Sequence, residues 1–337
     1  MPEAGGRLLS VIVPCHNVAR WLGRCLDEIF ASLPEDGEVI AVDDGSTDST
    51  ANILFEAALA DSRVRVIRQD NRGVSAARNA ALDVAHGKYV FFVDPDDGVE
   101  PDFFASMVSA MEEENADYCL CAYRERTDLS DSFRDVRLKS AYDCRTNEEI
   151  VSKYLPRIFG YSFADVRRWY RGEPLFARRE FATVWRAAFR REIIERHRIR
   201  FDESIELNED AMFNAEYLLR SNRMVSIGQP LYRVTAREGG LVRSVTRDRA
   251  RYAANKLRLL ERRKAIDAIS GGALAPVYAA SNVFTAMELL KLRRTRELKI
   301  FLADEAVKSS LKGFPISPRR PIVALVFGIL RICSNFL

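Results

Sequence analysis

Three carboxylates directly follow an apolar run near residue 90. Every residue from Tyr89 to Val93 is apolar or aromatic, and Asp94, Asp96 and Asp97 come next, with one proline among them. Carboxylates this crowded raise one another's pKa unless a cation neutralises them. Oxygen ligands suit Mg²⁺ or Mn²⁺ better than zinc, so one interpretation is a divalent cation site. The stretch alone is equally consistent with an Asp-Pro-Asp turn before a helix, because Asp and Pro are ordinary turn residues.

Polar residues also close two other apolar runs, at 8–14 and 38–42. These residues are Pro14, Cys15, His16, Asn17, Asp43, Asp44, Gly45 and Ser46. Open α/β sheets bind their ligands beyond the carboxyl ends of the strands. Three polar clusters at one edge of one sheet therefore predict a nucleotide site with a metal ion.

Apolar runs typical of strands alternate with segments of helical spacing in the first part of the chain. This alternation predicts a parallel, doubly wound sheet. The sequence has no GxGxxG after the first strand and no GxxxxGK[ST], which argues against a dinucleotide oxidoreductase or a P-loop NTPase. The expected strands are 8–14, 38–42, 64–69, 89–93 and 117–123, and the expected helices are 18–33, one ending near 60, 75–86 closed by Gly87, and 102–115.

The overall composition narrows the class of protein. The net charge of +3 over 337 residues is too small to indicate nucleic-acid binding, so we expect no nucleic-acid partner. The six cysteines show no CxxC spacing and only three histidines are present, which argues against a zinc site. Residues 1–10 lack the apolar core of a signal peptide, so we expect a cytoplasmic protein.

The C-terminal third is rich in Leu, Ala, Arg and Lys, which predicts helices. Residues 322–330 are all apolar or glycine, yet crossing a bilayer takes about 20 apolar residues. With Arg319 and Arg320 before it, the segment fits a helix lying in the membrane interface. A helix docked on the protein's own core is the open alternative. We expect a peripheral contact of residues 319–337 with the inner face of the cell membrane.

Four strings in order and spacing resemble the family 2 glycosyltransferases of the GT-A fold. They are SVIVPCHN, VIAVDDGSTDST, DNRGVSAARNAAL and KYVFFVDPDDGVEPDF. A later segment, from TVWRAAF to AEYLL and then PLYRV, is similar to the acceptor side of bacterial polysaccharide glycosyltransferases. The resemblance implies an α/β GT-A fold with a doubly wound, mostly parallel sheet and a helical C-terminal extension. It divides the chain into a glycosyltransferase domain at 1–245, with a nucleotide-sugar half at 1–124 and an acceptor half at 125–245, and an extension at 246–337.

The resemblance also implies roles for individual residues on the donor side. Asp43 and Asp44 would accept hydrogen bonds from the base of a sugar nucleotide, while Pro14, His16 and Asn17 would line it. Family members often carry Tyr at the position of His16, which leaves the identity of the base open.

Arg78 and Asn79 belong to the ARN string that resembles the family. They would lie near the donor diphosphate or frame its loop. A purely structural role for Arg78 at the start of a helix stays open.

The resemblance assigns the metal and the base to separate parts of the chain. Asp94 and Asp96 form a DxD motif in which Asp96 would ligate Mn²⁺ or Mg²⁺ and Asp94 would assist, while Asp97 would orient the loop. Asp210 would be the catalytic base because it matches the family's ED motif, with Glu209 as the weaker candidate. Acidic residues in the first turn of a helix are also expected from the helix dipole alone.

These roles predict an inverting, metal-dependent glycosyltransferase. It would move one sugar from a nucleotide sugar to a hydroxyl of a glycan or lipid-linked acceptor in surface polysaccharide synthesis. The expected donor is a UDP-sugar. Arg168 and Trp169 are reminiscent of the QxxRW signature of processive synthases, but Asp165 replaces the Gln and the pair precedes Asp210, so we expect a single addition. The alternatives are a sugar-nucleotide-binding scaffold without catalysis and a sugar nucleotidyltransferase.

Overall fold

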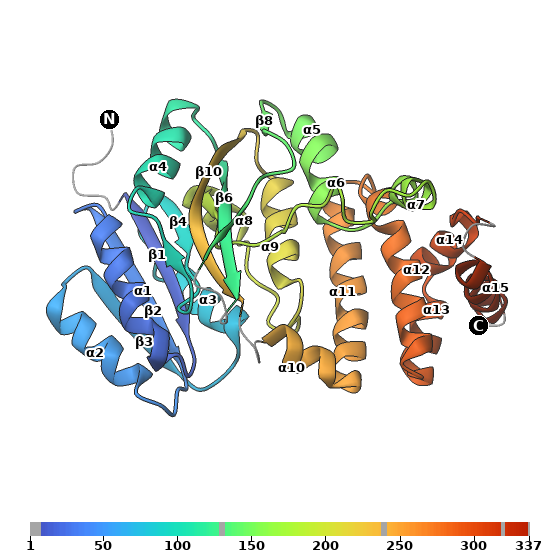
Figure 1. Ribbon diagram of the computed structural model, residues 1–337, viewed down its shortest axis with the longest axis horizontal. Helices are drawn as coiled ribbons and strands as arrows, with labels where there is room; N and C mark the ends of the chain where they lie inside the picture. Colours follow the sequence, from blue (N-terminus) through green and yellow to red (C-terminus); the bar gives the residue numbers. More distant parts are fainter. Residues whose placement is uncertain (1–7, 128–131, 237–240, 318–320, 336–337) are drawn as a thin grey trace. The chain divides into compact units, whose positions relative to one another are not determined.

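The computed structural model describes residues 8–127, 132–236, 241–317 and 321–335 (Figure 1). The chain divides into two compact units, and both draw on segments that are far apart in the sequence. The first unit contains Met1–Ile150, Thr183–Glu203 and Glu216–Glu238, and the second contains Val151–Ala182, Ser204–Ala215 and Gly239–Leu337.

A ten-stranded sheet organises the first unit. Strands β3, β2, β1 and β4 are parallel neighbours, β9 runs antiparallel between β4 and β6, and β10 pairs with β6 in parallel. The prediction of a mostly parallel sheet is confirmed, although β9 was not expected from the sequence. The strands, in order across the sheet, are β3 (Val64–Gln69), β2 (Gly37–Asp44), β1 (Leu9–Cys15), β4 (Tyr89–Phe92), β9 (Ala187–Arg190), β6 (Tyr118–Thr127), β10 (Met224–Ala236) and β5 (Gly98–Val99), with β7 (Arg134–Val136) on β6 and β8 (Asp143–Cys144) on β10.

Helices cover both faces of this sheet, as a doubly wound fold requires. Side chains of a strand point alternately to the two faces, and Val11 and Val13 of β1 share one buried cluster with residues of α1, α2 and α4. Helix α3 packs against β1 and β2, and its residues stand outside that cluster. The helices of this unit are α1 (Ala19–Ser32), α2 (Thr50–Ala60), α3 (Val74–Leu82), α4 (Phe103–Glu113), α5 (Asn147–Glu149) and α8 (Arg191–His197).

The third helix is shorter than expected. The prediction that it reaches His86 with Gly87 as its cap is wrong, because α3 ends at Leu82. Gly87 instead allows a close approach of two backbones: a Cβ there would lie 2.3 Å from the carbonyl carbon of Leu9 and from the nitrogen of Ser10. The N–H of Gly87 donates to Ser10 Oγ at 2.8 Å. The glycine therefore aligns the chain for the β1–β4 ladder.

The second unit is helical and has its own core. Leu260, Val283, Phe301, Leu311 and Phe327 are among the buried residues of that core. Gly271 and Gly272 lie in the break between α11 and α12. The helices are η1 (Ile150–Tyr154, a π-helix that starts at the boundary), α6 (Leu155–Ile158), α7 (Phe163–Tyr170), α9 (Glu209–Leu218, which continues into the first unit), α10 (Leu241–Arg247), α11 (Arg249–Ile269), α12 (Ala275–Lys291), α13 (Thr295–Ala303), α14 (Glu305–Gly313) and α15 (Pro321–Asn335).

Helix α15 combines a buried side with an exposed apolar side. Phe327 and Leu330 are buried in the core of the second unit, whereas Leu325, Ile329 and Ile332 are exposed. Within the described ranges, no helix is both long and apolar enough to cross a membrane. The helix is thus docked on its own unit and still presents apolar side chains to the outside. Arg319 and Arg320, which the sequence assigned to its flank, lie outside the described residues.

Candidate active site

The loops that follow β1 and β2 are cross-linked by Asn17. This residue adopts the left-handed conformation, with φ at 52°, which Asn tolerates better than most residues. Its side-chain oxygen accepts hydrogen bonds from the N–H groups of Thr47 at 2.8 Å and Asp48 at 3.3 Å. Its own N–H donates to Ser46 Oγ at 3.1 Å. The two predicted nucleotide clusters are therefore one connected structure.

The Asp44 carboxylate holds the loop between β3 and α3. It is buried and accepts three hydrogen bonds of 2.8 Å, from Gln69 Nε2 and from the backbone N–H groups of Arg72 and Gly73. Gly45, with φ at 69°, lets this loop come close, since a Cβ there would lie 2.7 Å from the nitrogen of Asn71. Most of the acceptor capacity of Asp44 is thus spent on shaping the site.

Asp43 has more acceptor capacity left than Asp44. Its Oδ1 accepts the N–H of Ser46 at 3.0 Å, whereas its buried Oδ2 makes no hydrogen bond within the described part of the chain. Oδ2 lies 3.4 Å from Nε of Arg68, whose side chain is 68% exposed. A ligand that displaced Arg68 would find an acceptor for an N–H group.

His16 is exposed beside these loops, and its hydrogen bonds fix its tautomer. Nδ1 lies 2.8 Å from the carbonyl oxygen of Asp44, which can only accept, so Nδ1 carries the proton. Nε2 then accepts from the side-chain amides of Asn17 at 3.1 Å and Asn71 at 3.2 Å. The imidazole is held in place at the position predicted to line the base.

The Asp94–Asp97 turn is tied to two distant parts of the first unit. The N–H of Asp97 donates to the carbonyl of Asp94 at 3.0 Å, and Arg78 Nη2 donates to Asp94 Oδ1 at 3.1 Å. From β10, the Tyr232 hydroxyl accepts the N–H of Asp94 at 3.0 Å, and the N–H of Thr235 donates to Asp97 Oδ1 at 3.0 Å. The turn is therefore braced from both sides.

Negative charge accumulates at this turn. Burial raises the pKa of Asp97 well above its usual range, and the neighbouring Asp96 and Asp94 raise it further. Burial raises the pKa of Tyr232 as well, and the carboxylates of Asp97 and Asp94 raise it further, so its hydroxyl keeps its proton. A cation at the turn would relieve this repulsion.

The carboxylates fit a cation that a substrate helps to hold. Among the described residues, no three His, Cys, Asp or Glu side chains converge closely enough to bind a metal ion by themselves. Mg²⁺ is typically held by one or two carboxylates together with substrate phosphates, and Mn²⁺ also favours oxygen ligands. Asp94 and Asp96 match that requirement, because both are only half-buried while Asp97 is buried.

Arg78 and Asn79 occupy the same helix but do different things. Arg78 is buried, stacks over the Phe201 ring at 5.2 Å and holds Asp94. The Asn79 amide accepts the N–H of Phe201 at 2.8 Å and donates to its carbonyl at 2.9 Å. Asn79 therefore frames the site through the segment that carries Phe201, and Arg78 contacts the predicted metal-binding turn.

The first unit brings together all of the predicted donor-side residues, whereas Asp210 belongs to the second unit. Glu209 and Asp210 open α9, and Asp210 is half-buried. Arg168 and Trp169 lie in α7, where Asp165 closes a capping box with Ser162 and pairs with Arg168. This arrangement gives Asp165 and Arg168 an ordinary helix-stabilising role.

Tyr232 is one residue of this site to which the sequence assigned no role. It lies in the PLYRV string, so the resemblance covered it, but no spacing rule joins it to a turn 138 residues earlier. The contact depends on the pairing of β10 with β5, in which Tyr232 lies opposite Val99.

Comparisons with known proteins identify the family of the chain. The chain is 29% identical to the uncharacterized glycosyltransferase EpsJ of Bacillus subtilis over 67% of its own length and 60% of EpsJ, so it spans less than two thirds of that relative. It is 27% identical to the succinoglycan biosynthesis protein ExoO of Rhizobium meliloti over 90% of its own length and 79% of ExoO. In fold it is similar to S. aureus TarS 1–349 in complex with UDP-GlcNAc, with a TM-score of 0.67, 20% identity, and coverage of 97% of this chain and 90% of that one. The family profile described as Glycosyl transferase family 2 matches residues 10–196, and the chain belongs to this family.

Proposed function

We propose that the protein is an inverting, metal-dependent glycosyltransferase that moves one sugar from a nucleotide sugar to a hydroxyl group. The observation that carries the proposal is the braced Asp94–Asp97 turn, at the end of a strand next to the one that leads into the His16 loop. Family membership supports the reaction class. TarS is described in complex with UDP-GlcNAc, which makes a UDP-sugar the first donor to test.

Asp43 is the residue best suited to recognise the base of the donor. Its Oδ2 accepts no hydrogen bond from the described residues, and a pyrimidine or purine N–H would satisfy it once Arg68 moves aside. Asp44 supports the loop around the base, and the fixed ring of His16 offers a face for stacking. Pro14 and Asn17 complete the wall on the β1 side.

Asp94 and Asp96 would hold Mn²⁺ or Mg²⁺ together with the donor diphosphate. A bound divalent cation supplies charge neutralisation for the departing nucleoside diphosphate. Arg78 keeps the Asp94 carboxylate in place from one side. Asp97, which is buried and bonded to Thr235, orients the turn instead of reaching the ligand.

Asp210 is the proposed catalytic base. An inverting displacement needs a carboxylate that accepts the proton of the acceptor hydroxyl. Asp210 stands in the first turn of α9, and its carbonyl accepts a hydrogen bond from Asn214 Nδ2 at 2.9 Å.

The division into a glycosyltransferase domain at 1–245 and an extension at 246–337 remains part of the proposal.

The acceptor is proposed to be a glycan or a lipid-linked saccharide used in surface polysaccharide synthesis. The name of ExoO, a succinoglycan biosynthesis protein, supports this class of pathway. The exposed apolar side of α15 supports contact with a membrane, and we place this contact at the cytoplasmic face, where a lipid-linked acceptor would lie. Residues 306–337 contain five Lys or Arg and no Asp or Glu, which suits an anionic surface.

Turnover of a panel of donors tests the reaction. Purified protein should release UDP from a UDP-sugar in the presence of Mn²⁺, and EDTA should abolish the release. Asp210→Asn should lower transfer to an added acceptor at least 100-fold while nucleotide binding persists. Donor binding without turnover of any nucleotide sugar would favour the scaffold, and formation of a sugar nucleotide from a nucleoside triphosphate would favour a nucleotidyltransferase.

Co-sedimentation with vesicles tests the membrane contact. Deleting α15 would also remove Phe327 and Leu330 from the core, so a triple substitution of Leu325, Ile329 and Ile332 by Asn is the better variant. We expect binding to anionic vesicles to fall about tenfold. As a matched control, Phe55→Asn with Leu59→Asn removes exposed apolar side chains of α2 and should leave vesicle binding unchanged. Equal losses in both variants would contradict the proposal.

A further inference from the structure

The Tyr232 hydroxyl lies inside the Asp94–Asp97 turn. It accepts the N–H of Asp94 at 3.0 Å. A phenol oxygen has lone pairs that accept hydrogen bonds, so the hydroxyl satisfies the backbone at the start of the turn. Phenylalanine at this position would leave the Asp94 N–H without this partner.

The ring of Tyr232 is held so firmly that the hydroxyl has one position. Its side chain is buried, the Trp185 ring stacks on it with centroids 4.6 Å apart, and Phe103 meets it edge-on at 5.9 Å. The backbone is fixed by the pairing of Tyr232 with Val99, which lies just after the turn. The phenol is therefore a rigid strut between β10 and the turn.

The neighbouring residues of β10 hold the same segment. Arg233 donates to the Val99 carbonyl at 2.8 Å and pairs with Glu28 at 2.9 Å. Thr235 bonds Asp97. Of these contacts, only the Tyr232 hydroxyl reaches the backbone of Asp94, the residue whose carboxylate faces the proposed cation.

We propose that Tyr232 is a positioning residue that orients the Asp94 and Asp96 carboxylates for cation binding. The inference rests on the proposed function, since it gives those carboxylates a cation to hold. Groups that bond to metal ligands typically change metal affinity 10- to 100-fold when they are removed. Loss of the Tyr232 hydroxyl should therefore weaken metal binding more than a similar loss of stability elsewhere in the protein would.

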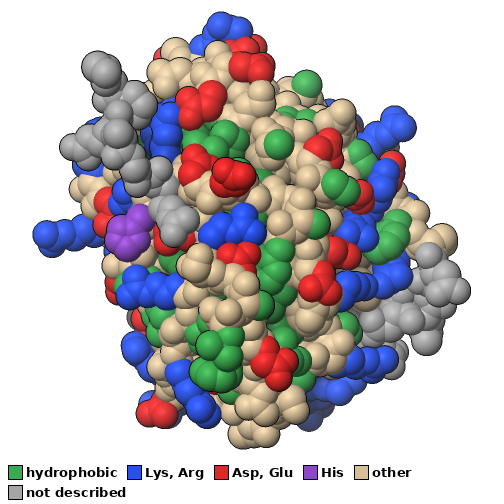
Figure 2. All heavy atoms as spheres, turned by 90° about the vertical axis from the view of Figure 1, so that its left-hand side faces the viewer, with side chains coloured by type: hydrophobic (Ala, Val, Ile, Leu, Met, Phe, Trp, Pro, Cys, Tyr) green, Lys and Arg blue, Asp and Glu red, His purple; other side chains and the backbone are tan. Residues whose placement is uncertain are grey.

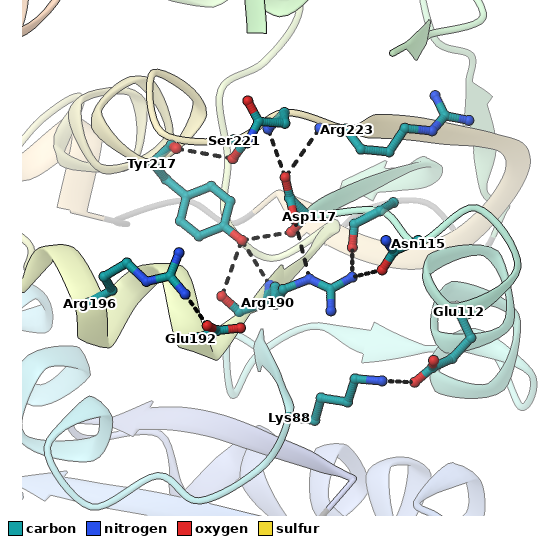
Figure 3. Close-up of polar contacts among 12 residues, drawn as sticks. Lys88, Glu112, Asn115, Asp117, Arg190, Glu192, Arg196, Tyr217, Ser221 and Arg223 are labelled. Carbon is teal, nitrogen blue, oxygen red and sulfur yellow. Dashed lines mark hydrogen bonds and ion pairs between the residues drawn. The ribbon is translucent and has the colours of Figure 1, made fainter. Parts of the chain in front are cut away.

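Tyr217 provides a matched control within the same unit. It is also buried, and Figure 3 shows its hydroxyl between Arg190 and Asp117. That hydroxyl donates to the Asp117 carbonyl at 2.6 Å and accepts the N–H of Arg190 at 2.8 Å. Tyr217→Phe removes another buried hydroxyl that accepts a backbone N–H, from a cluster at the amino-terminal end of β6.

The test measures Mn²⁺ affinity by the electron paramagnetic resonance of free Mn²⁺ in the presence of UDP, alongside thermal unfolding. Tyr232→Phe should weaken Mn²⁺ binding about tenfold or more, whereas Tyr217→Phe should leave it within twofold. Both variants should lower the melting temperature by similar amounts. Unchanged Mn²⁺ affinity in Tyr232→Phe, or equal weakening in both variants, would overturn the inference.

If the wild-type protein binds no Mn²⁺ with UDP, GDP or dTDP, the proposed metal dependence is wrong, and the inference about Tyr232 is then wrong as well.

Discussion

At the edge of the sheet shown in Figure 3, carboxylates are paired with basic side chains. Lys88 lies 2.5 Å from Glu112, and its hydrogen bond lowers the pKa of that carboxyl group. At the opposite edge, burial and two acidic neighbours raise the pKa of Asp97. The same sheet thus stabilises the ionised form of a carboxylate at one edge and disfavours it at the other.

This difference separates charges that stabilise the fold from charges for which we propose a role in ligand binding. Asp94, Asp96 and Asp97 repel one another when they are ionised together, and this repulsion opposes folding unless a cation neutralises it. Functional sites commonly depart from local stability rules in this way. Over the face shown in Figure 2, by contrast, basic and acidic side chains are interspersed.

The largest effect should come from Asp96→Asn. Removal of a proposed metal ligand should lower kcat by about 100- to 1000-fold, the range seen when one group that stabilises developing charge is lost. The melting temperature of the metal-free protein should stay the same or rise, because Asp97 loses a repulsive neighbour. Glu112→Gln, at the other edge, should leave kcat unchanged. Steady-state kinetics and calorimetry on both variants check the contrast, which fails if Asp96→Asn keeps wild-type kcat.

The next effect is on stability and comes from Arg190→Met. Its guanidinium, with a side chain 16% exposed, pairs with Asp117 and donates to the Ala116 carbonyl at 2.8 Å. Leaving these partly buried acceptors unpaired should cost about 2–3 kcal/mol, or roughly 5–10 °C in melting temperature.

A second ion pair in the same view controls for this change. Arg196 pairs with Glu192, but both side chains are more than 60% exposed, so Arg196→Met should cost less than about 0.5 kcal/mol. The donor KM should be the same in both variants. A raised KM in Arg190→Met would mean that the two edges are not independent.

The sequence was sufficient to bring the predicted donor-side residues together because their motifs are contiguous. His16, Asp43, Asp44 and Asp94 each follow an apolar run, and parallel strands bring their carboxyl ends together. The parallel arrangement predicts that all four lie close together, and the structure has all four in the first unit. Their partners were harder to foresee.

The contacts that brace the site come from pairings that no local pattern encodes. Strand β9 lies between β4 and β6 although it follows β6 by some sixty residues, so neither its insertion nor the approach of Phe201 to Asn79 could be predicted from periodicity. The role of Gly87 was missed for a related reason. A glycine after a helical pattern usually caps the helix, but here its missing side chain is needed by β1.

That glycine gives the third prediction, at the edge that serves folding. Gly87→Ala would place a Cβ 2.3 Å from backbone atoms of Leu9 and Ser10, which cannot yield as a flexible side chain can. The expected loss is about 1–3 kcal/mol of unfolding free energy in a urea titration. Gly23→Ala is the matched control: nothing lies within 4 Å of its Cβ in α1, and the change should stabilise the helix by up to about 1 kcal/mol. Equal stability of the two variants would contradict the close-packing role of Gly87.

The smallest effect concerns pH and sets the two edges against each other. In the folded protein the pKa of Glu112 is lowered, so its stabilisation is present above the ordinary carboxyl value of about 4.3 and is lost as the pH falls through the lowered folded value. Since Lys88 and Glu112 are 45% and 46% exposed, Lys88→Met should cost less than about 1 kcal/mol at pH 7, and nothing once Glu112 is protonated.

The pKa of Asp97 is raised, so the sign at its edge is reversed: its penalty is absent below the ordinary value of about 3.9 and grows as the pH rises towards the folded value. At low pH, Lys88→Met should therefore no longer melt below the wild type, and Asp96→Asn should no longer melt above it. Melting curves of the metal-free variants between pH 3 and 7 measure both trends. As the pH falls, the melting temperature of Lys88→Met should rise relative to wild type and that of Asp96→Asn should fall relative to wild type. A shift of both in the same direction would contradict the opposite pKa shifts at the two edges.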